Sequence, residues 1–295
     1  MRILLLGRNG QVGWELNRSL LPLGEVIALD RTQADLSRPE SLRKIVCDNH
    51  PDVIVNAAAY TAVDKAEEEE DLATVINSTA PGVLAEEADK SGALLIHYST
   101  DYIFDGTKDR PYTEDDLPNP INAYGRSKLA GEQAIQATKA DHLILRTSWV
   151  YAARGRNFLR TIMRLAKEMD ELTIVGDQTG SPTWARLIAE TTAHCLRQSV
   201  YERRKSVFSS GIYNVSSSGE TSWYGFASAI VNNARDRPEE KIHVSNIVPI
   251  QTRDYPTPAK RPAYSCLATE SLEENFNIVM PSWEYGLRLC MEELL

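Results

Sequence analysis

The first 150 residues alternate short apolar runs with longer amphipathic stretches, and this alternation most limits what the chain can fold into. The apolar runs are nearly continuous, as in parallel strands that are covered on both faces. They span residues 3–6, 26–29, 53–55, 94–98 and 143–150. Helical patterns lie between them, at residues 12–21, 39–48, 72–90 and 123–138. The alternation predicts an α/β fold with a Rossmann-like, doubly wound parallel sheet.

A glycine-rich segment follows the first apolar run. Gly7, Gly10 and Gly13 stand between the first predicted strand and the first predicted helix, in a GxxGxxG spacing. Gly7 permits a tight turn, Gly10 lets backbone N–H groups approach a pyrophosphate, and Gly13 allows close packing of helix on strand. The position of the segment predicts a dinucleotide-binding loop.

Asp30 ends the second apolar run, 20 residues after Gly10. A carboxylate at this point accepts hydrogen bonds from the adenosine ribose of a dinucleotide. Asp30 repels a 2′-phosphate, whereas the neighbouring Arg31 attracts one, so the sequence leaves NADH and NADPH both open. Asp35 and Leu36 follow as an adenine-edge loop, and the small residues within 56–60 let a cofactor lie against the backbone.

The most specific pattern is Tyr124-Gly125-Arg126-Ser127-Lys128. Positions i and i+4 of a helix share one face, so Tyr124 and Lys128 can point into one cleft. A free phenol has a pKa of about 10, and a nearby cation lowers that pKa toward the working range. Hydride addition to a ketone leaves an oxyanion that must be protonated, so the pair predicts a reductase.

Thr100 lies at the carboxyl end of the fourth predicted strand, where ligands bind in open α/β sheets. Its hydroxyl can hydrogen-bond a carbonyl oxygen and stabilise the charge that develops there. The alternative is a helix cap or turn residue. The position of Thr100 and its predicted partners favour the catalytic interpretation.

Residues 1–150 are therefore predicted to form an NAD(P)-binding Rossmann domain, with segments near 170–200 and 236–252 returning to it. Residues 151–295 are expected to form mainly a smaller substrate-binding domain that is interleaved with the first. Its predicted helices span residues 158–169, 182–198, 223–234 and 283–294, and its predicted strands span 172–175, 211–215 and 242–250.

Composition excludes several classes of protein. The net charge of −9 disfavours non-specific binding to nucleic acid or to an anionic membrane. The four cysteines form no CxxC pair, so neither a zinc site nor a disulfide framework is indicated. No apolar run approaches the roughly 20 residues that a transmembrane helix needs. We expect a cytoplasmic protein without a metal.

These motifs together resemble the extended short-chain dehydrogenase/reductase family, and within it the dTDP-4-dehydrorhamnose reductases. The matching stretches are spread over nearly the whole chain, at residues 55–59, 61–67, 97–104, 124–132, 145–151 and 258–262. The resemblance implies that NADPH or NADH reduces the C4 ketone of dTDP-4-dehydro-L-rhamnose to dTDP-L-rhamnose, a precursor of bacterial surface polysaccharide. It also implies a homodimer with a dTDP-sugar as its substrate.

The resemblance further implies roles for single residues. Tyr124 would be the proton donor, Lys128 its pKa tuner and ribose ligand, and Thr100 the partner of the carbonyl. Besides Tyr124 and Lys128, the implied cofactor-binding residues are Gly7, Gly10, Gln11, Val12, Asp30, Asp35, Leu36, Ala59, Tyr60 and Thr61. The implied substrate-binding residues are Thr100, Asp101, Tyr124, Trp149 and Arg261.

The sequence also bears on a diphosphate site and on a metal site. Lys260 and Arg261 lie in the proline-rich loop 255–262, where a basic pair suits a diphosphate; the alternative is a solvent-facing pair. Some members of the family hold magnesium at a dimer interface. Glu15 is present here, but Arg186 stands where a second carboxylate is expected, so no metal site is predicted.

Two other functions stay open, and a third lacks a residue that it needs. A dehydratase of the same superfamily would need a second carboxylate after Asp101, where this chain has Tyr102. An epimerase can use the same Tyr and Lys but keeps its NAD through the cycle. A regulatory subunit of methionine adenosyltransferase has the same fold without catalysis. The intact set of Thr100, Tyr124 and Lys128 favours an enzyme.

Overall fold

Six parallel strands form the central sheet of the computed structural model, which describes residues 1–294. The strands are β1 (Arg2–Leu6), β2 (Glu25–Leu29), β3 (Val53–Asn56), β4 (Leu94–Thr100), β5 (His142–Thr147) and β10 (Gly211–Val215). Their spatial order is β10-β5-β4-β3-β1-β2, and every neighbouring pair is parallel. The predicted α/β fold with a doubly wound parallel sheet is confirmed.

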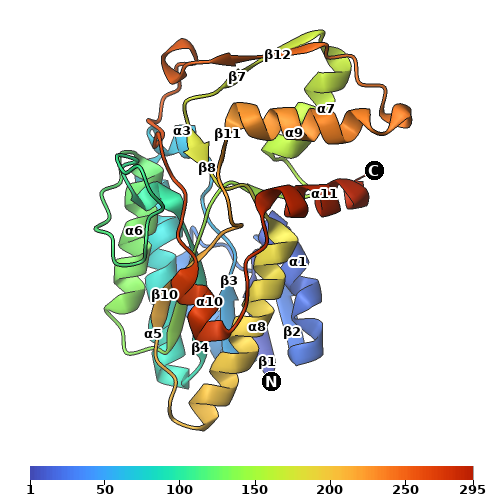
Figure 1. Cartoon of the computed structure of the whole chain (residues 1–295). Helices are drawn as coiled ribbons and strands as arrows, with labels where there is room; N and C mark the ends of the chain where they lie inside the picture. The colour runs from blue at the N-terminus through green and yellow to red at the C-terminus, as the bar shows by residue number, and fades with distance from the viewer. Residues whose placement is uncertain (295) are drawn as a thin grey trace.

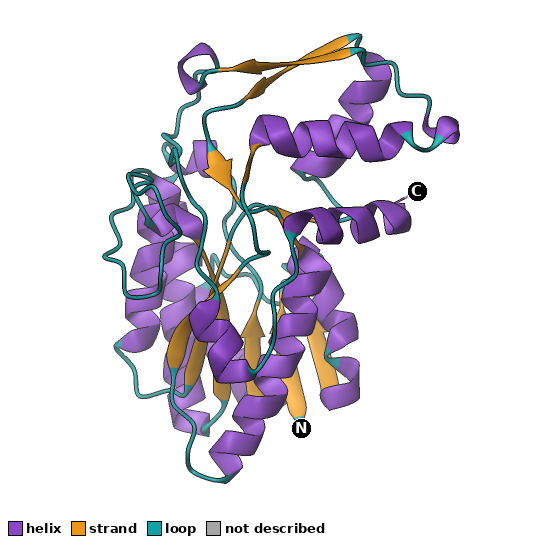
Figure 2. Ribbon diagram, in the orientation of Figure 1, coloured by secondary structure: helices purple, strands orange, loops and turns teal. Residues whose placement is uncertain are grey.

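Helices cover both faces of this sheet (Figures 1 and 2). One face carries α1 (Gln11–Ser19), α8 (Ala185–Arg204) and α10 (Glu270–Phe276); the other carries α2 (Pro39–Asn49), α5 (Ala80–Ser91) and α6 (Ala123–Gln136). Successive strand residues alternate between the two apolar cores, with Ile3 and Leu5 in one and Leu4 and Leu6 in the other. Burial on both sides explains the continuous apolar runs.

A second group of elements stands beyond the carboxyl ends of the strands, in the upper part of Figure 1. Helices α7 (Phe158–Glu168), α9 (Trp223–Arg235) and α11 (Trp283–Leu294) share a third apolar core. Strand β7 (Glu171–Val175) pairs with β12 (Asn246–Ile250). Two shorter pairs join β6 (Val150–Tyr151) to β9 (Thr183–Trp184) and β8 (Thr179–Gly180) to β11 (Thr221–Ser222).

The segments that return to the main sheet differ from those expected. The segment 236–252 does not return, because β12 pairs only with β7 in a separate two-stranded sheet. The returning strand is β10, which lies beside β5, and the returning helices are α8 and α10. The expected strand at 143–150 is also shorter, because the chain turns away after Thr147 and Trp149 adopts a φ of 44°.

The expected helix at 72–90 is divided. Helix α4 (Glu70–Thr74) leads into a π-helical turn, η2 (Val75–Thr79), before α5 begins. In this turn the side-chain amide of Asn77 accepts from the backbone N–H of Tyr60 (2.8 Å) and donates to its carbonyl (3.0 Å). The carbonyl oxygen of Asn77 also meets α6, where a Cβ atom on Gly131 would lie 2.1 Å from it. The turn therefore lets α6 pack closely.

A buried ion pair fastens α6 to the sheet. Arg146 of β5 donates to both carboxylate oxygens of Glu132 on α6, at 3.0 and 2.8 Å. The two side chains are 2% and 1% exposed. The remaining nitrogen of Arg146 donates to the carbonyl of Glu114 in the loop after β4 (3.4 Å). The guanidinium of Arg146 therefore connects the sheet, α6 and the loop after β4.

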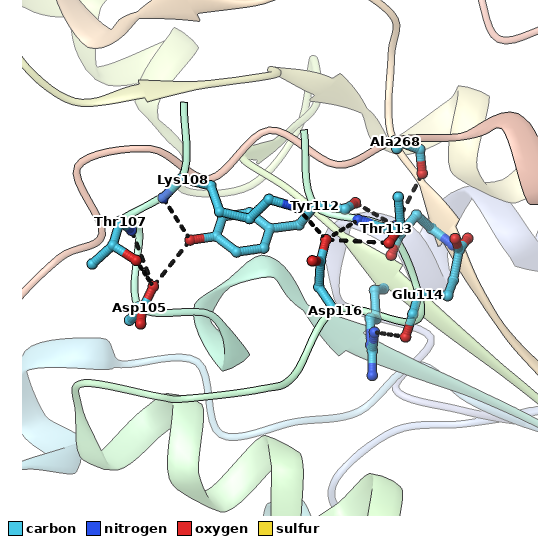
Figure 3. Close-up of polar contacts among 10 residues, drawn as sticks. Asp105, Thr107, Lys108, Tyr112, Thr113, Glu114, Asp116 and Ala268 are labelled. Atoms are coloured by element: carbon cyan, nitrogen blue, oxygen red, sulfur yellow. Dashed lines mark hydrogen bonds and ion pairs between the residues drawn. The ribbon is translucent and has the colours of Figure 1, made fainter. Parts of the chain in front are cut away.

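The loop around Glu114 is closed by its own polar contacts, which Figure 3 shows. Asp105 accepts hydrogen bonds from Thr107 and from the hydroxyl of Tyr112, and Asp116 forms an ion pair with Lys108. Asn214 of β10 ties the loop to the sheet by donating to the carbonyls of Tyr112 and Ala268, both at 2.9 Å. This excursion from the sheet is therefore an ordered part of the fold.

Glu132→Ala should lower the free energy of unfolding by about 3–5 kcal/mol, because it leaves the guanidinium of Arg146 buried without a counter-charge. The matched control is Glu70→Ala, which removes the partner of Arg126 on the same helix. That pair is about half exposed and should cost less than about 1 kcal/mol. Urea denaturation of both variants measures the difference. Equal losses would show that burial of the pair does not matter.

Candidate active site

A cavity of about 790 Å³ lies at the carboxyl ends of β1, β2, β3, β4 and β5. It brings together residues that are far apart in the chain. The predicted residues that line it are Gly7, Gly10, Gln11, Val12, Asp30, Asp35, Leu36, Ala59, Thr61, Thr100, Asp101, Tyr124, Lys128 and Trp149. Tyr60 and Arg261 do not line it.

The glycine loop forms one end of the cavity. A Cβ atom on Gly13 would lie 2.1 Å from the carbonyl oxygen of Gly7, so only glycine allows this packing of α1. A Cβ atom on Gly10 would meet nothing closer than 3.3 Å. Gly10 is the N-cap of α1, where no side chain caps the helix and the first turn has no acidic residue. The free N–H groups suit a phosphate.

Asp30 stands beside this loop and is held by several donors. The hydroxyl of Thr32 (2.6 Å) and the guanidinium of Arg8 (3.0 Å) both donate to its carboxylate. These contacts, those of Thr32 first, lower the pKa of Asp30, so it stays charged. Arg31 lies 3.6 Å from the carboxylate of Asp35. Sequence reasoning missed Arg8, which meets Asp30 only because β1 and β2 pair.

Tyr124 and Lys128 lie in the first two turns of α6, which the side chain of Asn122 caps. The ammonium of Lys128 donates to the carbonyl of Tyr98 (2.5 Å) and lies 3.2 Å from Nε2 of His97. Nδ1 of His97 lies 3.1 Å from the amide of Asn56. His97 and Asn56 were not among the predicted residues; only their places as polar residues within buried strands could have signalled them.

Burial controls the ionisation of this group. It lowers the pKa of Lys128 to about 8, and it also holds the pKa of His97 well below its usual range. Burial raises the pKa of Tyr124 to about 12, against a hydrogen bond with Thr100 that lowers it. The expectation that Lys128 brings the pKa of Tyr124 down is therefore wrong for this structure, in which Tyr124 is a neutral phenol.

Thr100 and Asp101 form the floor of the site next to Tyr124. The hydroxyl of Thr100 donates to the carboxylate of Asp101 (2.9 Å), which also accepts from the hydroxyl of Ser148 (3.1 Å). Asp101 is only 2% exposed, and burial raises its pKa to about 6. The carboxylate is thus held in place behind Thr100.

Two stacked tryptophans form the opposite wall. The rings of Trp149 and Trp223 are parallel within 3°, with centroids 3.5 Å apart. Trp149 has a left-handed backbone, which a non-glycine residue adopts only when its surroundings hold it there. Gly180 makes room, because a Cβ atom there would lie 2.3 Å from the Trp149 ring. Trp223, at the start of α9, was not predicted.

The two predicted residues outside the cavity are engaged elsewhere. Arg261 donates from both terminal nitrogens to the carboxylate of Asp64 (3.1 and 2.8 Å), and one of them also donates to the hydroxyl of Thr257. The hydroxyl of Tyr60 donates to Glu69 (2.6 Å). Neither side chain lines this cavity in the structure, so their expected contacts with the cofactor and the substrate stay predictions.

Residues 1–294 show two absences, one that concerns metals and one that concerns membranes. Glu15 forms an ion pair with Arg186 (3.1 Å), which also contacts Glu293. That described part of the chain holds no group of three or more His, Cys, Asp or Glu placed to bind a metal. Within the same residues, no helix combines the length and apolar character that crossing a bilayer requires.

Known proteins resemble this chain over its full length. A family model described as the RmlD substrate binding domain matches residues 1–295. The dTDP-4-dehydrorhamnose reductase of Burkholderia thailandensis is 56% identical, with 100% of this chain and 99% of that protein covered. The enzyme of the same name from Escherichia coli K12 is 46% identical, with coverages of 100% and 98%.

A solved structure shows the same likeness in three dimensions. The dTDP-4-dehydrorhamnose reductase of Bacillus anthracis, determined in complex with NADP, has a TM-score of 0.88 and is 36% identical, with 99% of both chains covered. Sequence, family model and fold thus agree over the whole molecule. The chain belongs to the dTDP-4-dehydrorhamnose reductase family and is an oxidoreductase.

Proposed function

We propose that this protein reduces the C4 ketone of dTDP-4-dehydro-L-rhamnose to dTDP-L-rhamnose, the last step of dTDP-rhamnose synthesis, with NADPH or NADH. The observation that carries the proposal is a neutral phenol, Tyr124, beside Thr100 in the same cavity as a glycine-rich helix N-terminus. The family to which the chain belongs supports it. The test mixes purified protein with this substrate and NADPH and follows the absorbance of the reduced cofactor. Binding without turnover would indicate a regulatory protein instead.

The cavity has the groups that a dinucleotide needs. Gly10 and the free N–H groups of α1 would hold the pyrophosphate, and Asp30 would accept from the ribose. The bound cofactor supplies a hydride. Asp30 disfavours a 2′-phosphate whereas Arg8 and Arg31 attract one, so the site suits both NADH and NADPH.

Two side chains act on the carbonyl oxygen, and Lys128 supports one of them. Tyr124 donates its proton to the oxygen as negative charge develops, which requires the neutral phenol that burial maintains. Thr100 would turn its hydroxyl from the carboxylate of Asp101 to donate a hydrogen bond to the same oxygen. Lys128, one helical turn from Tyr124, is cationic below about pH 8 and offsets the charge that the phenol gains.

The second half of the chain would provide the substrate domain. We assign residues 1–150 to the cofactor and residues 151–295 mainly to the dTDP-sugar, with Asp101 and Trp149 as contacts to the substrate. Trp223 joins this set because it stacks on Trp149 and lines the cavity. The protein would act as a homodimer in the cytoplasm. Light scattering of the purified protein tests the dimer.

Tyr124→Phe should keep the fold and the affinity for NADPH but reduce kcat by about 10²–10⁴-fold, because only the proton donor is lost. Steady-state kinetics and a cofactor titration measure the two effects separately. The control is Tyr285→Phe, an exposed tyrosine on α11 far from the cavity. A kcat equal to that of the wild type in the Tyr124 variant would remove this residue from the mechanism.

The value of kcat/KM should fall as the pH rises through about 8, since kcat/KM reports ionisations of the free enzyme and Lys128 loses its proton there. The sign follows from the lowered pKa: the charged form exists below about 8 and the neutral form above. Lys128→Met should remove this limb of the profile, and the exposed Lys139→Met should leave it unchanged. A profile that stays flat up to pH 9.5 in the wild type would contradict the role of Lys128.

Gly13→Ala and Gly10→Ala should separate folding from cofactor binding. Alanine at position 13 meets the carbonyl of Gly7 at 2.1 Å, so we expect a loss of stability of about 1–3 kcal/mol. Alanine at position 10 meets no such contact, and it should retain stability while it weakens NADPH binding. Thermal unfolding and calorimetric titration give the two readouts. Normal NADPH binding by the Gly10 variant would argue against a pyrophosphate beside this residue.

A further inference from the structure

The loop formed by residues 152–157 reaches from the second half of the chain to the glycine-rich loop. Gly155 and Arg156 line the same cavity as Gly10 and Gln11. Gly155 has a φ of 75°, and a Cβ atom on it would lie 3.7 Å from Cγ of Gln11. The loop therefore lies against the start of α1, where the free N–H groups face the cavity.

A cation–π contact holds the loop against α1. The guanidinium of Arg154 stacks over the ring of Trp14 at 3.1 Å, and Arg18 lies 3.7 Å from the same ring. The side-chain amide of Asn157 also donates to two backbone carbonyls of the loop, those of Ala152 (2.8 Å) and Arg154 (3.0 Å). These contacts fix the backbone on either side of Arg156.

Arg156 differs from the other cations of the cavity. Arg31 lies beside Asp35, and Lys128 is buried against Tyr98 and His97. Arg156 is exposed at the cavity, and within residues 1–294 it forms no hydrogen bond or ion pair. The side-chain oxygen of Gln11 is likewise buried without a hydrogen-bond partner. Among the described residues, Arg156 is thus a cation without a partner beside the start of α1.

We propose that the loop 152–157 is a strap over the pyrophosphate of the dinucleotide, and that Arg156 is its cationic ligand opposite the N-terminus of α1. Guanidinium groups bind phosphate oxygens with two parallel hydrogen bonds, and the helix N-terminus attracts the same charge from the other side. The substrate also carries a diphosphate, but Gly155 touches the helix that faces the cofactor. The proposal rests on the proposed function, since it needs a dinucleotide in this cavity.

Calorimetric titration of the full chain tests the strap with three ligands: NADPH, 2′-AMP, which lacks the pyrophosphate, and dTDP. Arg156→Ala should raise the Kd for NADPH by about 10- to 100-fold, because a charged hydrogen-bonding partner is lost. The Kd values for 2′-AMP and dTDP should stay within about twofold of the wild type. Arg156→Lys should recover part of the loss, since lysine cannot form the paired hydrogen bonds.

Two further variants complete the test. Arg164→Ala removes the same charge from the adjacent helix α7, outside the cavity, and should leave the Kd for NADPH unchanged. Trp14→Leu removes the ring on which Arg154 stacks, and it should weaken NADPH binding less than Arg156→Ala does. A weakened dTDP affinity with normal NADPH binding in Arg156→Ala would overturn the strap and assign Arg156 to the substrate. Unchanged binding of all ligands would overturn it too, whereas a wild type that binds neither NADPH nor NADH would refute the proposed function itself.

Discussion

The buried ion pair between Arg146 and Glu132 sets the position of the helix on which the chemistry depends. Two charges removed from water gain little net free energy, but they leave only one arrangement in which both are satisfied. Helix α6 is held there along its length, because Gly125 and Gly131 let it approach the carbonyls of Tyr102 and Asn77. The phenol and the ammonium are therefore carried by a helix that cannot shift without leaving a charge unpaired.

Burial at the site favours the neutral form of each of its ionisable groups. The pKa of Tyr124 moves up to about 12, that of Asp101 up to about 6, and that of Lys128 down to about 8, so each group is moved toward its neutral form. Burial of this kind gives strong electrostatic weight to the few groups that face the reacting oxygen. The aromatic wall of Trp149 and Trp223 adds apolar surface beside them.

Strands, the glycine loop and the helix face that carries Tyr124 and Lys128 depend on local sequence and could be predicted. Contacts between residues far apart in the chain could not. Apolar runs reveal strands buried on both faces, and the spacings of Gly7 to Gly13 and of Tyr124 to Lys128 identify a loop and a helix face. The contact of Arg261 with Asp64 could not be predicted, because the two residues are 197 positions apart in the chain. Trp223 reaches the cavity, and Arg8 reaches Asp30, only through packing that no spacing encodes. The pKa of Tyr124 was predicted in the wrong direction because its depth of burial, unlike the position of Lys128, is a tertiary property.

The late return of the chain to its first sheet has a consequence for biosynthesis. Strand β10 and helices α8 and α10 come from beyond residue 184, yet they complete one edge and one face of the sheet that begins at residue 2. While the ribosome is still making these segments, Ile3, Leu5, Val53 and Leu94 have no complete apolar cover. The nascent first half therefore keeps part of its apolar surface exposed until nearly the whole polypeptide has emerged.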